Sequence, residues 1–237
     1  MSLVPELPPE WTSVLTRPSD PHWLNRLRAE IETIYSTATA AVYPHASDVF
    51  RAFELTLPDS LRVVIVGLDP YRVRDPAKPN GSVADGLAFS ARGHKPPASL
   101  QTMLYNLWQS REIELPPAEG DLAPWALDQG VLLLNLSLTV QRGAQDSDRA
   151  AQRALYRELI ESVLEYASSR QGDPVAFLLL GEEAKRVEAS IANPLQGQVV
   201  TARHPSRSWW PSAGDTEYPF TAINEFLGPD RRVDWRL

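Results

Sequence analysis

Four short stretches of almost continuously apolar, often β-branched residues constrain the fold of this chain more than any other feature. They span residues 61–68, 131–135, 175–181 and 198–202. Strands of this kind are typical of a parallel sheet that is buried on both faces. Segments with helical spacing separate these stretches, and such alternation predicts an α/β fold with a mainly parallel sheet covered on both sides.

The helical segments are recognised by the spacing of their apolar residues. In residues 22–37, Leu24, Leu27, Ile31 and Ile34 recur at intervals of three and four, which places them on one helix face. The same reasoning predicts further helices over residues 46–53, 99–111, 122–129, 146–168 and 182–191.

Composition excludes several classes of chemistry. The 237 residues include no cysteine, so disulfides, thiolate nucleophiles and cysteine zinc sites are impossible. Neither metal-binding nor phosphate-loop motifs are found, and we therefore expect no metal and no cofactor. A formal net charge of −7 argues against a broad basic footprint for nucleic acid. A local positive groove would still suffice, because salt screens charges beyond about 8–10 Å.

The ends of the chain and its longest apolar runs bear on location and organisation. The sequence begins without a basic segment followed by an apolar run, and its apolar stretches are far too short to span a bilayer. We expect a monomeric, cytoplasmic protein with no membrane association. Residues 1–237 are predicted to form a single domain, in which the proline-rich residues 1–20 form an N-terminal arm.

Three polar residues leave three different predicted strands. Asp69 follows the first strand, Asn135 ends the second and His204 follows the last. Ligands of parallel sheets bind beyond the carboxyl ends of the strands, so these side chains are expected to converge at one rim. Each also has a structural interpretation: Asp69 and His204 could belong to proline turns, and Asn135 could bond to nearby backbone. Functionally, a carboxylate can orient water, an amide can read a base edge, and an imidazole can stabilise a leaving group.

Motifs around these residues resemble those of the family-1 uracil-DNA glycosylases. GLDPYR at residues 67–72 is similar to the family's water-activating motif GQDPYH, VLLLN at 131–135 to its uracil-reading strand, and HPS at 204–206 to the start of its DNA-intercalation loop. Weaker matches, such as LPPEW, GLAFS and PPASL, keep the family's order along nearly the whole chain. The resemblance implies a three-layer α/β/α sandwich with a central four-stranded, mainly parallel sheet. It also implies hydrolysis of the N-glycosidic bond of a flipped base, without a cofactor.

The resemblance assigns the chemistry to the three converging residues. By matching position, Asp69 would orient the water and offset positive charge on the sugar, His204 would donate to the base O2, and Asn135 would bond to N3–H and O4. Bond cleavage produces an oxocarbenium-like sugar and an anionic base. A carboxylate and a neutral donor therefore stabilise the two halves of the separating charge, each by roughly 2.7–4 kcal/mol.

Recognition residues also follow from the resemblance. Phe89 would stack on the flipped base, and Tyr71 would crowd the C5 position and exclude thymine. Ser99 and Ser206 would hold DNA phosphates.

The sequence departs from the family at the first motif. Leu68 replaces a base-binding glutamine, and Arg72 replaces a histidine but can still hold a phosphate through its guanidinium fork. The stretch between Tyr71 and Phe89 is longer than is typical of the family. This stretch could contact DNA, reshape the pocket beside C5, or be a tolerated surface insertion.

A second departure lies after HPS, where Arg207, Ser208, Trp209 and Trp210 are expected to contact DNA. Ser208 stands where the family has a leucine wedge. One of the tryptophans could replace the wedge by stacking, which contributes about 1–3 kcal/mol per base, or both could pack inward as loop anchors.

Three functions are therefore considered. The first is a base-excision-repair glycosylase that removes uracil from single- or double-stranded DNA and leaves an abasic site. The second is a glycosylase for a different, C5-modified pyrimidine. The third is a catalytically silent relative that binds DNA lesions, which the changes at Leu68 and Arg72 suggest.

Overall fold

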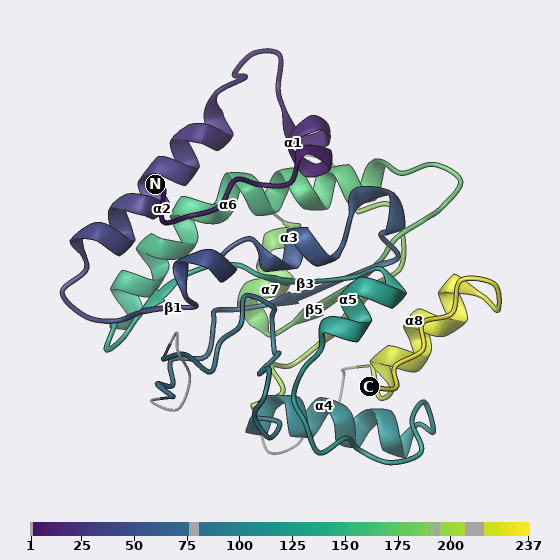
Figure 1. Cartoon of the computed structure of the whole chain (residues 1–237). Helices are drawn as coiled ribbons and strands as arrows, with labels where there is room; N and C mark the ends of the chain where they lie inside the picture. Colours follow the sequence, from purple (N-terminus) through teal and green to yellow (C-terminus); the bar gives the residue numbers. More distant parts are fainter. Residues whose placement is uncertain (1, 76–80, 190, 192–194, 207–215) are drawn as a thin grey trace.

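A central parallel sheet organises the molecule (Figure 1). The structure is a computed structural model and describes residues 2–75, 81–189, 191, 195–206 and 216–237. The sheet has four strands in the order β3-β2-β5-β6, and all three pairings are parallel. Its strands are β2 (Val63–Gly67), β3 (Val131–Asn135), β5 (Ala176–Leu180) and β6 (Val199–Ala202). Every residue of β2, β3 and β5 is buried, as their apolar sequences predict.

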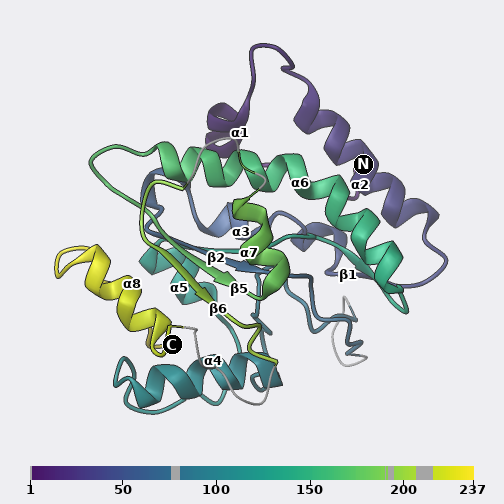
Figure 2. The ribbon, with the colours of Figure 1, turned by 180° about the vertical axis from the view of Figure 1, so that it is seen from behind.

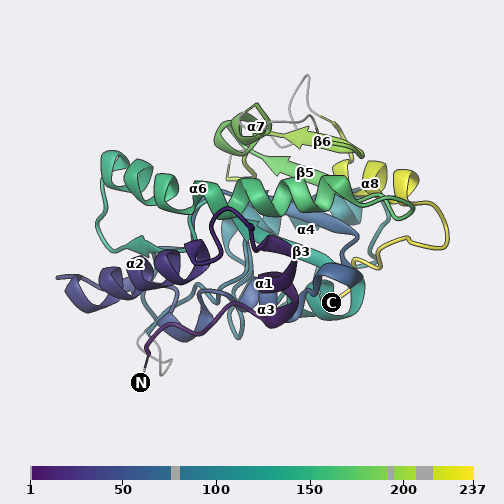
Figure 3. The ribbon, with the colours of Figure 1, turned by 90° about the horizontal axis from the view of Figure 1, so that it is seen from above.

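Helices cover both faces of this sheet, which confirms the predicted α/β/α class. In Figures 1 and 2, α6 lies on one side of the sheet, whereas α4 and α8 lie on the other. Figure 3 shows α6 crossing the sheet when the molecule is seen from above. The helices are α1 (Pro9–Leu15), α2 (Trp23–Thr37), α3 (Arg51–Leu55), α4 (Ala98–Gln109), α5 (Ala123–Gln129), α6 (Asp146–Ser169), α7 (Glu182–Glu188) and α8 (Pro219–Leu227).

The helix predicted over residues 46–53 is wrong in one respect, because two elements occupy it. A 3-10 turn over Ala46–Asp48 is followed by α3, and Phe50 between them has non-helical backbone angles (φ −103°, ψ 14°). Apolar spacing alone does not reveal this break, since Val49, Phe50 and Phe53 are all buried and fit one helical face.

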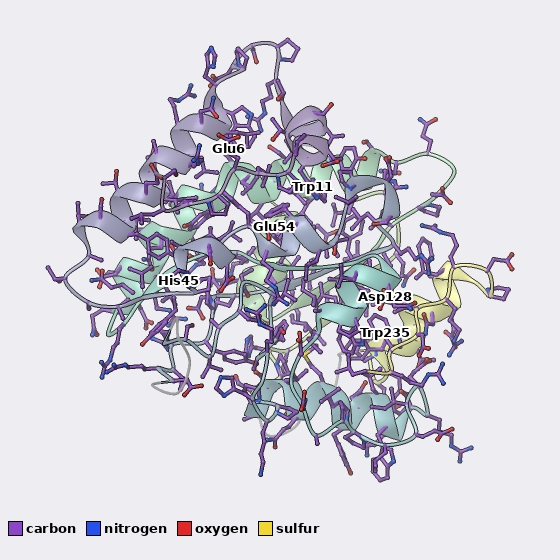
Figure 4. The ribbon with its side chains drawn as sticks, viewed as in Figure 1. Glu6, Trp11, His45, Glu54, Asp128 and Trp235 are labelled. Atoms are coloured by element: carbon purple, nitrogen blue, oxygen red, sulfur yellow. The ribbon has the colours of Figure 1, made fainter. Side chains whose placement is uncertain are left out.

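Other elements were not anticipated from the sequence. Within residues 1–20, expected only as an arm, α1 buries Trp11 completely, and the Trp11 indole donates to the Thr56 carbonyl at 2.8 Å. The unanticipated α8 packs near the carboxyl-terminal Trp235, whose ring lies 5.0 Å from those of Trp125 and Phe220. Trp11 and Trp235 are labelled in Figure 4. A small antiparallel sheet pairs β1 (Val42–Tyr43) with β4 (Val140–Gln141).

Within the described residues, no helix is both long enough and apolar enough to span a membrane.

Candidate active site

The predicted site residues meet in one cavity of about 450 Å³ at the carboxyl ends of the strands. Every member of the predicted set that the structure describes lines it: Leu68, Asp69, Tyr71, Arg72, Phe89, Ser99, Asn135, His204 and Ser206. The other predicted residues, Arg207, Ser208, Trp209 and Trp210, lie outside the described part of the chain.

Gly67 allows an amide and an aromatic ring to meet at the end of the sheet. It pairs in register with Asn135, and a Cβ at position 67 would lie 2.6 Å from Asn135 Oδ1 and 3.1 Å from Phe89 Cε2. No real Cβ atom approaches an oxygen so closely, so these two side chains require glycine here. The Asn135 side chain is buried and forms no hydrogen bond with the described residues. Buried amides are normally hydrogen-bonded, and this one is therefore suited to a ligand.

Phe89 has an unusual backbone that Tyr71 stabilises. Its φ of +65° is uncommon for a residue other than glycine. Tyr71 Oη donates to the Phe89 carbonyl at 3.0 Å and lies 3.0 Å from Ser99 Oγ. A phenol has one proton, so the Ser99 hydroxyl must be the donor in the second bond. Burial raises the pKa of Tyr71 to about 12, which keeps the phenol neutral in the physiological range.

A buried ion pair supports the turn that carries Phe89. Asp85 accepts hydrogen bonds from the Ser90 hydroxyl at 2.7 Å and the Arg92 backbone N–H at 3.0 Å. Its carboxylate also pairs with Arg51 at 3.0 Å, and the two side chains are 3% and 9% exposed. Sequence reasoning missed this pair, although an aspartate directly before the apolar GLAFS segment was a usable signal.

The long stretch between Tyr71 and Phe89 folds back on itself at its described ends. The Val83 N–H donates to the Val73 carbonyl at 3.2 Å, and Arg74 forms an antiparallel bridge with Ser82. Val83 is buried and Val73 is exposed, so this stretch contributes to both the core and the surface.

His204 is presented as a neutral hydrogen-bond donor. The Ser206 backbone N–H donates to His204 Nδ1 at 3.2 Å, and the Ser206 hydroxyl lies 2.9 Å from the same atom. A ring nitrogen that accepts a backbone N–H carries no proton, so the proton resides on Nε2. The imidazole lies 5.7 Å from the Phe89 ring between centroids. Asn135, Phe89 and His204 thus all line the same cavity.

Gly181 is a residue that sequence reasoning missed. It follows β5 with a φ of +99°, and a Cβ there would lie 3.1 Å from His204 Cβ. The glycine lets the loop after β6 pack directly against the end of β5. Its signal was present as the residue that closes the apolar run VAFLLLG.

Arg149 was also missed by sequence reasoning, and it contacts the predicted catalytic acid. Its Nε donates to Asp69 Oδ2 at 2.7 Å, and its Nη1 donates to Asp146 Oδ1 at 2.8 Å. The side chains of Arg149 and Asp69 are only 16% and 15% exposed. The two residues lie 80 positions apart, and no local motif connects them.

The charge around the site is mixed. A groove that adjoins the cavity is lined by three arginines, Arg72, Arg149 and Arg203, and by three carboxylates, Asp69, Glu182 and Glu183. Among the described residues, no group of three or more histidine or acidic side chains is arranged to hold a metal ion.

The fold and the site together define a class of protein. A parallel sheet that presents a carboxylate, a neutral imidazole and an amide without a hydrogen-bond partner among the described residues to one cavity is suited to cleaving a bond between a base and a sugar. This is the class of the base-excising glycosylases.

Comparison with known proteins identifies the family. The family model of the Uracil DNA glycosylase superfamily matches residues 55–228. A protein of Bacillus cytotoxicus named uracil-DNA glycosylase is 32% identical over 231 residues, which cover 96% of each chain. One of the same name from Desulfitobacterium hafniense is 33% identical, also over 96% of each chain. This chain belongs to the uracil-DNA glycosylase superfamily, which confirms the resemblance seen in the sequence.

Solved structures share the fold. The crystal structure of mimivirus uracil-DNA glycosylase matches with a TM-score of 0.76 and 22% identity, and the match covers 99% of this chain and 88% of the other. UNG from Nitratifractor salsuginis matches with a TM-score of 0.53 and 20% identity, over 84% of this chain and 88% of the other.

Proposed function

We propose that this protein is a uracil-DNA glycosylase of base-excision repair, which hydrolyses the N-glycosidic bond of uracil in DNA and leaves an abasic site. The observation that carries this proposal is full-length similarity to proteins of that name in a chain whose predicted site residues line one cavity. No relative or contact favours a C5-modified base or a silent lesion binder, so neither alternative is pursued.

The reaction assigned to the cavity separates charge between sugar and base. Asp69 orients the attacking water and stabilises the oxocarbenium-like sugar. His204 donates from Nε2 to the base O2 as negative charge develops there, a role that its Nδ1 contact with the Ser206 N–H supports. Asn135 pairs with N3–H and O4 through its amide, which has no hydrogen-bond partner among the described residues. Preorganised groups of this kind stabilise the transition state without reorganisation.

Uracil is selected by shape as well as by hydrogen bonds. Phe89 stacks on the flipped base, and Leu68 contributes an apolar wall where the family has glutamine. Tyr71 excludes a C5 methyl group, because its bonds to the Phe89 carbonyl and to Ser99 prevent it from moving aside. A flipped thymine would therefore collide with a fixed ring.

The DNA backbone is held around the mouth of the cavity. Arg72 and Ser206, both exposed, are assigned to phosphates, as is Ser99 at the start of α4. Arg207, Ser208, Trp209 and Trp210 are assigned to the strand that surrounds the flipped base. The substrate is single- or double-stranded DNA. The protein acts as a cytoplasmic monomer, and residues 1–237 form one domain that includes the N-terminal arm over residues 1–20.

A panel of oligonucleotides tests this proposal. Wild-type protein is expected to release uracil and to leave thymine, 5-hydroxymethyluracil and modified cytosines intact. The Asp69→Asn variant should lose about 100–1,000-fold in single-turnover rate, by analogy with the loss of one oxyanion-hole donor. Arg157→Gln, an exposed change on α6, serves as the matched control and should retain the wild-type rate. Uncut uracil, or an unimpaired Asp69→Asn variant, would refute the assignment.

A further inference from the structure

We propose that Arg149 is a positioning residue, which holds the Asp69 carboxylate in its reactive orientation. This inference rests on the proposed function, because it presupposes that Asp69 directs the water. Arg149 Nε binds Asp69 Oδ2 at 2.7 Å. Among the described residues, Asp69 Oδ1 accepts no hydrogen bond and is left for the water or the sugar.

The contact is short and well shielded from solvent. A guanidinium–carboxylate pair is a charge-assisted hydrogen bond, and such bonds are roughly twice as strong as neutral ones. With 16% of Arg149 and 15% of Asp69 exposed, water weakens this pair less than it weakens a surface ion pair. Arg149 Nη1 also donates to Asp146 at 2.8 Å, but the side chain of Asp146 is 97% exposed. Asp69 is therefore the partner that matters energetically.

Arg149 stands on a rigid element, whereas Asp69 lies in a loop. The first turn of α6 is closed by a capping box, in which the Gln145 N–H donates to Asp148 Oδ2 at 3.0 Å. About two turns further on, buried Tyr156 bonds to Thr139 at 2.7 Å and fixes the helix to the segment after β3. Through Arg149, the anchored helix α6 therefore restrains Asp69, whose side chain would otherwise be as free to move as other loop side chains.

The arginine has opposing effects on catalysis, and geometry decides between them. Its positive charge offsets part of the field that Asp69 applies to a cationic sugar. A carboxylate that points away, however, orients no water at all, and a misplacement of 1 Å can cost about 100-fold in rate. Because Arg149 is already engaged by Asp69, it is not free to serve mainly as a phosphate ligand. Its removal should lower the rate of the chemical step and leave substrate affinity nearly unchanged.

The first test compares variants of Arg149 by single-turnover kinetics on uracil-containing oligonucleotides. Arg149→Gln should lower kcat by about 10–100-fold, the usual loss when a supporting residue is removed, with KM changed less than about twofold. Arg149→Lys, which keeps the charge but not the fork, should recover part of the rate. Arg153→Gln, one turn further along α6 and in no ion pair among the described residues, is the matched control and should behave as wild type. A rise in KM at constant kcat would overturn the inference.

The second test is a double-mutant cycle with Asp69→Asn. If Arg149 acts through Asp69, adding Arg149→Gln to Asp69→Asn should change the rate by less than about twofold, since coupled residues are not additive. Full additivity would overturn this inference while the proposed function stands. An Asp69→Asn variant with wild-type activity would instead overturn the proposed function.

Chemical rescue distinguishes a positioning role of Arg149 from a merely structural role. Arg149→Ala should regain activity in millimolar ethylguanidinium, while the same concentration of sodium chloride should not restore it. If Arg149→Ala does not fold, Arg149→Lys in the same double-mutant cycle replaces it. Failure of both the cation and the lysine to restore any rate would contradict a positioning role.

Discussion

We name the two sides of this cavity by their proposed roles, the base-reading side and the water side, and different forces hold them in place. On the base-reading side, Gly67, Phe89 and Asn135 are buried, and a Cβ at position 67 would lie 2.6 Å from Asn135 Oδ1 and 3.1 Å from Phe89 Cε2. On the water side, Asp69 lies in a loop, and a single ion pair with Arg149 holds it. Close packing leaves a side chain few alternatives, whereas an ion pair fixes a group through one replaceable partner.

This difference indicates which parts of the site tolerate substitution. Specificity depends on the closely packed side chains of the base-reading side, where an added atom would overlap a neighbouring one. Substitutions there should therefore change activity strongly. Orientation of the acid depends on one direct charge-assisted hydrogen bond, which another arginine could supply from a neighbouring position. In this chain, the departures from the family motif at Leu68 and Arg72 flank Asp69 and leave Gly67 in place.

The largest expected effect follows from breaking the packed side with Gly67→Ala. The new methyl group would meet Asn135 Oδ1 at 2.6 Å, and the flexible amide would have to move. We expect about 100-fold loss of uracil-excision rate, because the amide can no longer reach the base edge. The free energy of unfolding should fall by about 1–3 kcal/mol, since the methyl group would also lie 3.1 Å from Phe89 Cε2 and 3.2 Å from Ala88 Cβ.

The control for this prediction is a cycle with Asn135→Ala. If the methyl group acts by displacing the amide, Gly67→Ala should cost little more once Asn135 is already truncated. Thermal unfolding reports stability in the same variants. A Gly67→Ala protein with the wild-type rate would show that packing does not hold the base-reading side.

How far the sequence predicts this site depends on which contacts are local. The four strands were recognisable because each is a continuous apolar run, and β3 begins and ends at the predicted residues. The convergence of Asp69, Asn135 and His204 followed from the rule that parallel strands end at one edge.

The contacts that support these groups were not recognisable. Arg149 reaches Asp69 from 80 residues away, and Arg51 reaches Asp85 from 34 residues away, so only the tertiary fold relates them. Helix α8 was overlooked for a different reason. Its sequence, PFTAINEFL, follows polar and proline-rich residues that indicate loop, whereas Phe220, Ile223 and Leu227 are buried against the rest of the core.

Gly181→Ala should have a smaller effect. It tests the position of the His204 imidazole, which lies between the base-reading side and the water side. Alanine there is strained by the φ of +99° and brings a methyl group within 3.1 Å of His204 Cβ. Displacement of His204 should lower the excision rate by about 10-fold, a fraction of the 100–1,000-fold that complete loss of such a donor costs. The measurement is single-turnover release of uracil.

Gly172→Ala provides a matched control for backbone strain. Gly172 also has a positive φ, of +87°, but a Cβ there would meet nothing within 4 Å. Both variants should lose stability, by roughly 1–2 kcal/mol for a left-handed residue with a Cβ. Only Gly181→Ala should lose activity. Equal losses of activity in the two variants would mean that strain, and not contact with His204, is responsible.

The smallest expected effect sharpens the comparison, because Tyr71→Phe removes two hydrogen bonds and keeps the ring. Each lost bond contributes about 0.5–1.5 kcal/mol, and the ring that meets uracil is unchanged, so excision of uracil should fall by less than about 10-fold. Discrimination against thymine should weaken more, since a ring no longer bound to Phe89 and Ser99 can move away from a methyl group. The ratio of uracil to thymine release measures this directly.

The same variant has a distinctive dependence on pH. Burial raises the pKa of Tyr71 to about 12 in the folded state, above the value of 10.0 for an exposed phenol. Between these values the folded protein binds more protons at this position than the unfolded chain, so the stabilising contribution is complete below pH 10 and declines as pH rises toward 12. The difference in unfolding free energy between wild type and Tyr71→Phe should therefore shift against wild type over that range. A difference that stays constant from pH 9 to 12 would mean that the phenol is not buried, and that the base-reading side is less tightly packed than its contacts indicate.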